Sequence, residues 1–464
     1  MKPRTLLILL ALVVGLGAFI VFYEGDLPSS EERAEQAKRV FAVEADEVTA
    51  LRLESGGRTV RLTKEPKTEG GPAPGWQLVE PITARADTAL VTSLVAALSG
   101  LEKSRSLPDY DANELGLSSP RARIAVVTAK GETVLEVGAQ LPSSESTIAR
   151  LAGAREALVV PGSFMADATR EAADWRDRTI FRAERSAIQS LAVTRGTGER
   201  LLLSRRGEGF WIESPLNDRA DREAVDGLLS ALTGLKATRF AGLAAVPPEA
   251  GLGTPTTVVE VVLTGQEVPW KLALGAPETP GSLSRWARAG GEAFTTDSDL
   301  PSRLEKDVAS WRSLAWSGLF SWEVEKAEVR DATGTLTLER DGGDWQRNGE
   351  KMPYTPVGDF LAAIAEAKAE RLLDAPPAGE PVMTVTLEAK EGKKETLSLY
   401  PTATEGGTDG APAGSAERPA AHLLLSPATA ADLRAKLDSL RATPALPKEE
   451  AKAGEAKVES EKGE

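Results

Sequence analysis

Residues that could carry out chemistry are few in this sequence. It holds no cysteine and one histidine, His422. This composition excludes cysteine nucleophiles, disulfides, thiolate zinc sites and iron–sulfur clusters. His422 directly precedes the apolar run 423–425, which favours a buried or rim histidine over a general base. Phosphate-binding loops, dinucleotide-binding glycine patterns, nucleophile elbows and paired-histidine zinc motifs are missing. We therefore predict no catalytic, cofactor-binding or metal-ligating residue, and a protein that is not an enzyme.

Carboxylates are the remaining candidates for chemistry. Asp297, Ser298 and Asp299 resemble part of a calcium loop, but the glycine and the distal glutamate of such a loop are missing. We interpret the triplet as a helix cap. The 69 acidic residues include enough carboxylates for a glycosidase pair, yet nothing sets any two of them apart. An envelope hydrolase therefore stays open as a minor alternative.

Tryptophans could bind sugar or peptide, because exposed indoles form stacking platforms. The spacing predicts that Trp76, Trp211 and Trp345 occupy one recurring position, and the offset from Trp211 to Trp345 is 134 residues. Recurrence at one position predicts a packing role in the core. The pairs Trp175-Arg176 and Trp311-Arg312 recur as well. We interpret them as joints between units, with a stacked or ion-paired arginine rather than a ligand-binding one.

Trp76, Trp211 and Trp345 belong to a stretch that occurs three times. The first copy spans residues 75–105, and the second spans 209–239, 134 residues further on. Both contain a glycine, an aromatic strand, a proline, an Ala-Asp pair and a leucine-rich run that ends at arginine. A less regular third copy spans residues 343–371. A period of this length predicts tandem structural units.

Each unit combines short strands with helices. Alternating apolar residues in 48–54 and 59–63 predict a hairpin around Gly56-Gly57. Asp87 is a natural N-cap for a helix to about Lys103. The pattern predicts further helices at 163–173, 221–236, 356–371 and 427–441. Residues 402–419, rich in Gly, Ala and Pro, are predicted to be a loop that replaces one strand of the third unit.

The fold class that follows is α+β. We expect an N-terminal transmembrane helix and then three tandem repeats of antiparallel sheet plus helices, in an elongated arrangement. The predicted parts are a cytoplasmic tip with the anchor (1–23), a stalk (24–43), repeat units at 44–181, 182–320 and 321–443, and a disordered charged tail (444–464).

Residues 5–23 form the predicted membrane anchor. The 18 residues from Leu6 to Tyr23 carry no charge and would span about 27 Å as a helix, close to the thickness of a bilayer's hydrocarbon core. Lys2 and Arg4 before the span and acidic residues after it place the N-terminus in the cytoplasm. A cleaved signal peptide is the alternative, but bulky Phe22 and Tyr23 stand where small residues would be expected.

The net charge of -14 argues against nucleic acid as a partner.

An ordered set of short motifs carries a resemblance to a known family. The set comprises Arg39-Val-Phe41, Gly75-Trp-Gln-Leu-x-x-Pro81, Leu135-Glu-Val-Gly138, Ala157-Leu-Val-Val160 and Asp174-Trp-Arg-Asp-Arg178. It resembles a bacterial domain-of-unknown-function family of membrane-anchored, periplasm-facing repeat proteins, often encoded beside gliding-motility-type ABC transporters. The resemblance covers residues 1–440 and is strongest in the first two units. It supplies no catalytic residues.

The resemblance implies a single-pass protein of the bacterial inner membrane with most of its chain in the periplasm. The expected function is a non-catalytic accessory or scaffold, with an ABC transporter permease or auxiliary subunit as partner. The alternative is a module that binds an envelope glycan or another surface polymer in clefts between the units. No cofactor is expected.

Overall fold

The computed structural model describes residues 38–67, 74–142, 145–242, 246–405 and 408–446. The predicted anchor at 5–23, most of the predicted stalk and residues 447–464 of the predicted tail lie outside these ranges. Among the described residues, none of the helices has the length and apolar character needed to cross a membrane. The described residues divide into two compact units, with the boundary between Arg178 and Thr179.

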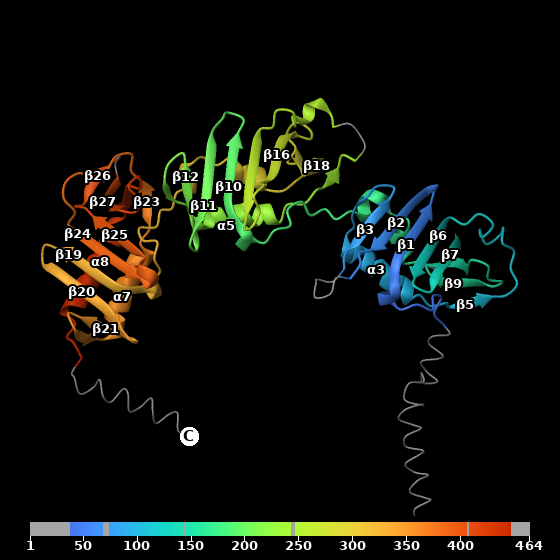
Figure 1. Ribbon diagram of the computed structural model, residues 1–464, viewed down its shortest axis with the longest axis horizontal. Coiled ribbons are helices and arrows are strands. Elements are labelled where there is room, and N and C mark those ends of the chain that lie inside the picture. Colours follow the sequence, from blue (N-terminus) through green and yellow to red (C-terminus); the bar gives the residue numbers. More distant parts are fainter. Residues whose placement is uncertain (1–37, 68–73, 143–144, 243–245, 406–407, 447–464) are drawn as a thin grey trace, which may run out of the picture. The chain divides into compact units, whose positions relative to one another are not determined.

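Three antiparallel sheets follow one another along the chain (Figure 1). The first two have nine strands each and the third has ten. We call repeat 1 the part built on β1–β9, repeat 2 the part built on β10–β18, and repeat 3 the part built on β19–β28. Repeat 1 lies in the first compact unit, and repeats 2 and 3 lie in the second. Tandem sheet repeats are thus present, as predicted.

Repeat 1 has the strand order β4-β3-β2-β1-β6-β7-β8-β9-β5. Its strands are β1 (Val48–Ser55), β2 (Arg58–Lys64), β3 (Trp76–Glu80), β4 (Ala84–Arg85), β5 (Arg105–Leu107), β6 (Ala122–Thr128), β7 (Gly131–Gln140), β8 (Ser146–Leu151) and β9 (Ala157–Pro161). Its α-helices are α3 (Thr88–Ser99) and α4 (Met165–Ala168), and a 3-10 helix, Ala172–Trp175, closes it.

Repeat 2 has the same order, β13-β12-β11-β10-β15-β16-β17-β18-β14. Its strands are β10 (Ile188–Arg195), β11 (Arg200–Arg206), β12 (Gly209–Ser214), β13 (Asp218–Arg219), β14 (Arg239–Phe240), β15 (Thr257–Leu263), β16 (Trp270–Pro277), β17 (Arg285–Ala289) and β18 (Glu292–Thr296). Its α-helices are α5 (Arg222–Thr233) and α6 (Leu300–Leu304), and the 3-10 helix Ala309–Trp311 closes it.

Repeat 3 has the order β22-β21-β20-β19-β24-β25-β27-β28-β23, with β26 beside β27. Its strands are β19 (Val324–Asp331), β20 (Gly334–Asp341), β21 (Asp344–Arg347), β22 (Glu350–Met352), β23 (Ala369–Leu372), β24 (Met383–Ala389), β25 (Lys394–Leu399), β26 (Ala403–Glu405), β27 (Thr408–Ser415) and β28 (Leu423–Leu425). Its α-helices are α7 (Tyr354–Glu366) and α8 (Pro427–Ala442).

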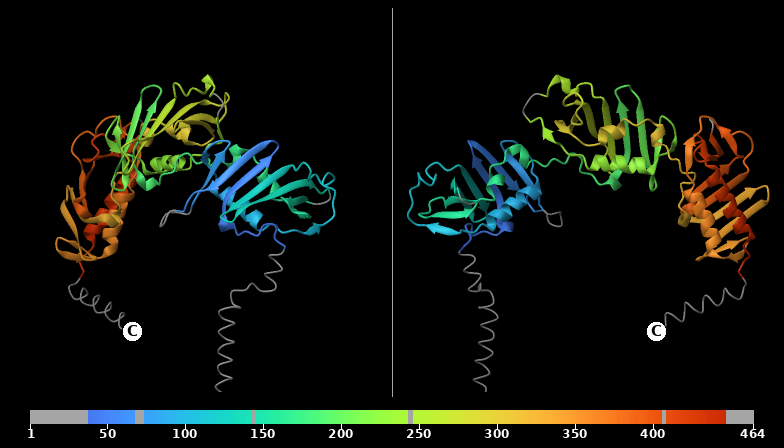
Figure 2. Two further views of the ribbon diagram at one scale, coloured as in Figure 1. Left: turned by 45° about the vertical axis from the view of Figure 1, so that its right-hand side comes forward. Right: turned by 180° about the vertical axis from the view of Figure 1, so that it is seen from behind.

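One helix in each repeat connects the two edges of its sheet. In repeat 1, α3 follows the edge strand β4 and leads to β5, which pairs with β9 at the opposite edge. The helix lies against one face of the sheet, as Figure 2 shows most clearly for α5 in repeat 2. Apolar residues occur every three or four positions along the helix and form one apolar side. This side packs on inward side chains of the strands, such as Leu51 and Leu62 in repeat 1. Each repeat therefore has its own hydrophobic core.

The starts of α3 and α5 were predicted correctly. The Asp87 carboxylate accepts the backbone N–H of Leu90 at 3.1 Å, and the Asp221 carboxylate accepts that of Ala224 at 2.8 Å. These bonds satisfy amides that a helix cannot pair within itself. Both helices end earlier than predicted, at Ser99 and Thr233, each before a glycine.

The opposite face of the sheet carries a smaller apolar cluster in repeats 1 and 2. In repeat 1 it is centred on Leu117, Ile148 and Ala157, and in repeat 2 on Ala250, Leu252, Trp286 and Ala293. In each of these repeats a connector segment, containing Leu115 in repeat 1 and Ala250 in repeat 2, covers this face and approaches the sheet closely. A Cβ on Gly138 would lie 2.2 Å from the carbonyl oxygen of Leu115, and a Cβ on Gly275 would lie 2.1 Å from the carbonyl oxygen of Ala250. Glycine in the strand is what admits the connector there.

The predicted equivalence of Trp76, Trp211 and Trp345 is wrong for Trp211. In repeat 2, the buried aromatic at this strand position is Phe210, which is 6% exposed, against 3% for both Trp76 and Trp345. Trp211 pairs with Arg219 as Gln77 pairs with Arg85, so it points to the other face of the sheet. Side chains alternate along a strand, and a shift of one residue in the sequence comparison therefore exchanges core for surface.

Three further predictions were wrong. Residues 402–419 are not a loop that replaces a strand, because β27 lies between β25 and β28 and buries Ala411 and Ala413 completely. The helix predicted at 356–371 ends at Glu366, and Ala369–Leu372 form the edge strand β23. The helix predicted at 163–173 is reduced to the four residues of α4, and the 3-10 helix Ala172–Trp175 follows it.

Candidate functional site

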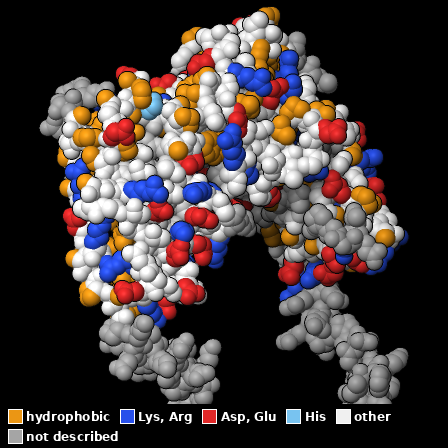
Figure 3. Space-filling view, turned by 60° about the vertical axis from the view of Figure 1, so that its left-hand side comes forward, with side chains coloured by type: hydrophobic (Ala, Val, Ile, Leu, Met, Phe, Trp, Pro, Cys, Tyr) orange, Lys and Arg blue, Asp and Glu red, His pale blue; other side chains and the backbone are white. Residues whose placement is uncertain are grey.

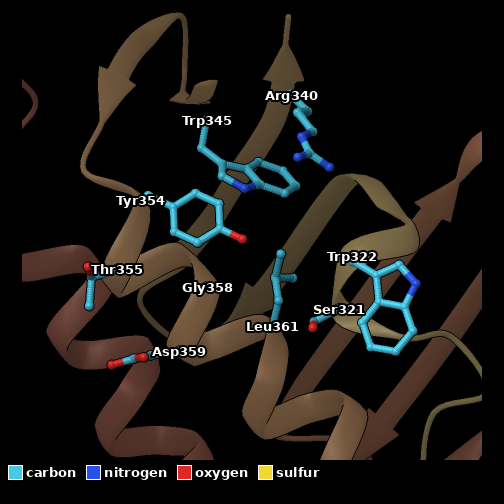
Figure 4. A pocket seen from close by; sticks show the side chains of 9 residues that line it. All are labelled: Ser321, Trp322, Arg340, Trp345, Tyr354, Thr355, Gly358, Asp359 and Leu361. Atoms are coloured by element: carbon cyan, nitrogen blue, oxygen red, sulfur yellow. The ribbon is translucent and has the colours of Figure 1, made fainter. Parts of the chain in front are cut away.

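A hollow of about 240 Å³ opens in repeat 3 (Figure 4). Three elements surround it: the 3-10 helix Ser321–Glu323, the hairpin of β20 and β21, and the first two turns of α7. The residues that line it are Ser321, Trp322, Arg340, Trp345, Tyr354, Thr355, Gly358, Asp359 and Leu361. They combine three aromatic rings with a guanidinium, a carboxylate and hydroxyls.

Trp322 and Tyr354 are the exposed aromatic side chains of the hollow, at 66% and 64% exposure. Large aromatics gain free energy by burial, so two of them left in solvent around one depression are characteristic of a binding surface. Trp345 lies at the back of the hollow and is buried in the core of repeat 3. Its position on β21 follows from the alternation of the strand.

Trp322 is held in place by a stack. Its ring lies 4.3 Å from that of Phe320, with an angle of 9° between the planes. The guanidinium of Arg222, at the start of α5 in repeat 2, lies 4.8 Å from the centre of the Phe320 ring. The Phe320 ring therefore contacts both the indole of Trp322 and the guanidinium of Arg222. The stack fixes the indole while leaving it two-thirds exposed.

Tyr354 lies along α7 because residue 358 is glycine. A Cβ on Gly358 would stand 3.3 Å from an edge carbon of the Tyr354 ring. Residues four apart on a helix face the same side, so a side chain at 358 would pack tightly against the Tyr354 ring and shift it slightly. Gly358 thus serves to position Tyr354 at the hollow.

Arg340 brings a positive charge to the hollow. Its Nε is buried, and within the described part of the chain that atom has no hydrogen-bond partner. Its guanidinium lies 6.0 Å from the centre of the Trp345 ring. On another side of the hollow, the Asp359 carboxylate lies 3.5 Å from the Lys436 ammonium, in an exposed pair. A buried donor without a partner costs free energy, which a ligand oxygen would recover.

A second cluster of charged residues lies between repeats 2 and 3 and is buried. Asp218 of β13 accepts hydrogen bonds from Arg312 Nε at 2.7 Å and Arg418 Nε at 2.6 Å. Glu395 of β25 accepts hydrogen bonds from Arg219 at 3.2 Å and from the Ser317 hydroxyl at 2.7 Å. We call these six residues the junction network. Its partners come from both repeats, so it joins them.

The junction network also uses backbone carbonyls. Arg418 donates to the oxygens of Ala315 and Ser313, at 2.8 and 2.6 Å. Burial and then the neighbouring Arg418 lower the pKa of Arg219 to about 10, while Glu395 opposes that shift. The guanidinium of Arg219 therefore keeps its charge at neutral pH. With its charges satisfied on all sides, the network can hold the two repeats in one arrangement.

The recurring Trp-Arg pairs have a structural role. Trp175 and Trp311 belong to the hydrophobic cores of repeats 1 and 2, with 0% and 1% exposure. Their carbonyl oxygens accept the backbone N–H of Asp87 and Asp221, both at 2.8 Å. Arg312 is ion-paired, as predicted, and its partner is Asp218. Neither indole is available to a ligand.

The other residues considered from the sequence do not come together. His422 is half-buried before β28, and its backbone carbonyl accepts the N–H of Leu373. Asp299 stands before α6, but its carboxylate binds Arg303 at 2.8 Å instead of capping the helix. The Asp297 carboxylate accepts from Thr238. Within the described ranges, no group of three or more potential metal ligands occurs.

The hollow was missed from the sequence. Its signal would have been two aromatics, Trp322 and Tyr354, outside the apolar pattern of strands and helices. Trp322 lies in the 3-10 helix directly before β19, and Tyr354 precedes the first buried position of α7, Val357. Arg340 could not have been singled out, because the burial of its Nε without a hydrogen-bond partner among the described residues depends on the fold.

Comparisons with known proteins agree with the repeat. Two overlapping segments, residues 76–255 and 211–389, match the sequence model of a family described as a domain of unknown function, DUF4340. Their starts are 135 residues apart, close to the period found in the sequence, and together they cover residues 76–389. No curated protein and no solved structure matches the chain. Since the matched segments span more than half of its length, the chain belongs to the DUF4340 family.

Proposed function

We propose that this protein is a non-catalytic accessory or scaffold protein of the bacterial inner membrane, anchored by residues 5–23 with its repeats in the periplasm. Its proposed partner is the permease or an auxiliary subunit of an ABC-type export or gliding-motility-like complex. The transporter link comes from the resemblance of the sequence motifs. The membrane link comes from the apolar run between Leu6 and Tyr23.

The junction network is the observation that carries the scaffold role. Asp218, Arg312 and Arg418 form a buried ionic cluster between repeats 2 and 3. Buried ion pairs add little net stability compared with apolar packing, but they demand one geometry. A cluster that fixes two sheets against each other suits a protein that presents surfaces to a partner.

The described surface is compatible with this role. On the face drawn in Figure 3, basic and acidic side chains are interspersed and hydrophobic side chains are scattered. A field of one sign, as expected for a nucleic-acid-binding face, does not dominate there.

In-cell crosslinking followed by mild detergent extraction tests the proposal. The tagged full-length protein would be purified and its partners identified by mass spectrometry. Recovery of an ABC permease and ATPase is expected, and their loss when residues 1–23 are exchanged for an unrelated anchor would place the contact in the membrane. Recovery of envelope proteins without any transporter component would refute the proposal.

A second candidate function is the binding of an envelope glycan or another surface polymer. The hollow of repeat 3 favours it, because Trp322 and Tyr354 are exposed beside Arg340. The site differs from the one expected from the sequence, since the hollow lies within a repeat and the tryptophans of the Trp-Arg pairs are buried.

A further inference from the structure

We infer that the hollow of repeat 3 binds a six-membered sugar ring that carries a carboxylate. The inference deepens the second candidate function by naming the ligand class. It does not depend on the transporter partner, because the hollow is formed by residues 321–361 alone.

The size of the hollow suits one ring. Its volume of about 240 Å³ is below the range of roughly 300–1,000 Å³ typical of pockets for drug-sized ligands. A monosaccharide, or the terminal unit of a longer chain, is a ligand of that size. The opening to solvent leaves room for the rest of such a chain.

The aromatic side chains suit the faces of a sugar ring. A pyranose has C–H groups on its faces and hydroxyls around its edge, so it stacks on aromatic rings while its edge forms hydrogen bonds. Trp322 is fixed against Phe320 and still 66% exposed, and Tyr354 stands on α7. Figure 4 shows these two rings on different sides of the hollow, with Trp345 behind them. Preorganised aromatics bind with little loss of side-chain entropy.

The polar side chains suit the edge of the ring. Ser321 and Thr355 contribute hydroxyls, and Asp359 contributes a carboxylate that can accept from sugar hydroxyls. A few polar groups at the border of an apolar surface are the usual means by which such sites fix the orientation of a ligand.

Arg340 selects for the carboxylate. Its Nε is buried without a partner among the described residues, and its planar guanidinium can bind a carboxylate through two parallel hydrogen bonds. The hydroxyls of a neutral sugar carry no charge, so their hydrogen bonds to the guanidinium are weaker than those of a carboxylate. The Trp345 ring could attract a cationic ligand, but the positively charged guanidinium of Arg340 already lies beside that ring and repels a second cation.

Titration calorimetry on the purified full-length protein in detergent tests the inference. The probes are oligomers of galacturonic acid, oligomers of glucuronic acid and N-acetylmuramic acid, each compared with its methyl ester, in which the charge is removed and one methyl group is added. We expect at least one acid to bind about tenfold more tightly than its ester, as for a hydrogen-bonded charge. Arg340→Gln should abolish that difference, and Arg340→Lys should keep part of it.

Trp322→Ala and Trp211→Ala form the matched pair of variants. Trp322→Ala should weaken binding of acid and ester several-fold, because it removes the stacking surface. Trp211→Ala, which removes a surface tryptophan in repeat 2, should leave both affinities unchanged. Circular dichroism of each variant checks that it is folded.

Several outcomes would overturn the inference: no binding by any acidic probe, equal affinities for acid and ester, or binding that Trp322→Ala leaves intact. Binding of acidic peptides in preference to all of the sugars would overturn it as well. None of these results bears on the transporter partner, which the crosslinking experiment tests separately.

Discussion

Arg418 donates a hydrogen bond of 2.6 Å to Asp218 although the two residues lie 200 positions apart in the chain. Both side chains are completely buried. Asp218 belongs to the edge strand β13 of repeat 2, and Arg418 follows β27 in repeat 3. The carboxylate also binds Arg312, so one acidic group neutralises part of the charge of two arginines. At the corresponding place in repeat 1, the residue before Arg85 is Ala84, which has no carboxylate to offer.

We predict that Asp218→Asn destabilises the protein strongly. The substitution leaves Arg312 and Arg418 buried without their counterion, and breaking a buried pair in this way costs about 3–5 kcal/mol. Urea denaturation of the purified protein measures the change in free energy of unfolding. The control is Asp299→Asn in the exposed pair with Arg303, where the expected loss is about 0.5 kcal/mol or less. Equal losses in the two variants would contradict the structural role of the network.

We predict that repeat 3 loses stability in acid through Asp331. Hydrogen bonds from Arg441 lower the pKa of the Asp331 carboxyl from 3.8 to about 2. Because the pKa in the folded state is the lower one, the pair stabilises the fold fully above about pH 4. That contribution, about 1–2 kcal/mol for a partly exposed pair, is lost as the pH falls from 4 to 2.

Thermal unfolding as a function of pH measures this effect. Asp331→Asn should remove that part of the pH dependence and lower the melting temperature at pH 7. Asp344→Asn, in the more exposed pair with Lys351, should keep the dependence of the unaltered protein. An unchanged pH profile in Asp331→Asn would show that the Arg441 contact is not formed.

We predict opposite outcomes for two neighbouring aromatics of β12. Phe210 is buried in the core of repeat 2, so Phe210→Ala should cost about 3–5 kcal/mol. Trp211 lies on the other face under Arg206, whose guanidinium is 4.7 Å from the indole, and Trp211→Ala should cost about 1 kcal/mol. Denaturant unfolding compares the two variants, and a larger loss for Trp211→Ala would reverse the assigned faces.

We predict that Gly275→Ala destabilises repeat 2 by about 1–3 kcal/mol. The new methyl group would meet the carbonyl oxygen of Ala250 at 2.1 Å, and the connector could only avoid it by moving away from the sheet. Gly209→Ala is the matched control, because a Cβ at that strand position meets no atom within 4 Å. Its stability should change by about 0.5 kcal/mol or less. Similar melting temperatures for both variants would mean that the connector does not approach β16 so closely.

The elements predicted best from the sequence are those whose signals are local. Asp87 and Asp221 cap their helices through their own side chains, and the hairpin at Gly56-Gly57 needs only a turn that tolerates positive φ. The repeat was detectable because each copy must build the same sheet.

The elements that were missed depend on partners far away in the chain. β4 and β13 have two residues each, and β5 exists only because the chain returns to β9 after the helix. β27 consists of residues that usually avoid strands, yet its alternating Ala411 and Ala413 fit between β25 and β28 where larger side chains would not. The hollow was missed for the same reason, since Trp322 and Arg340 meet only in the folded repeat.

The place of Arg418 in the chain has a consequence for truncation. The segment that completes the environment of Asp218 lies 200 positions later in the chain and is synthesised after repeat 2, so repeat 2 receives these contacts only when repeat 3 has formed. In a linear array of repeats, stability is the sum of each repeat and its interface with the next. Removing repeat 3, by a stop codon or by a protease, would therefore expose Asp218 and Arg312 to solvent and leave Asp218 without Arg418. Repeat 3 thus supplies contacts that repeat 2 lacks on its own, and we expect its loss to weaken repeat 2 as well.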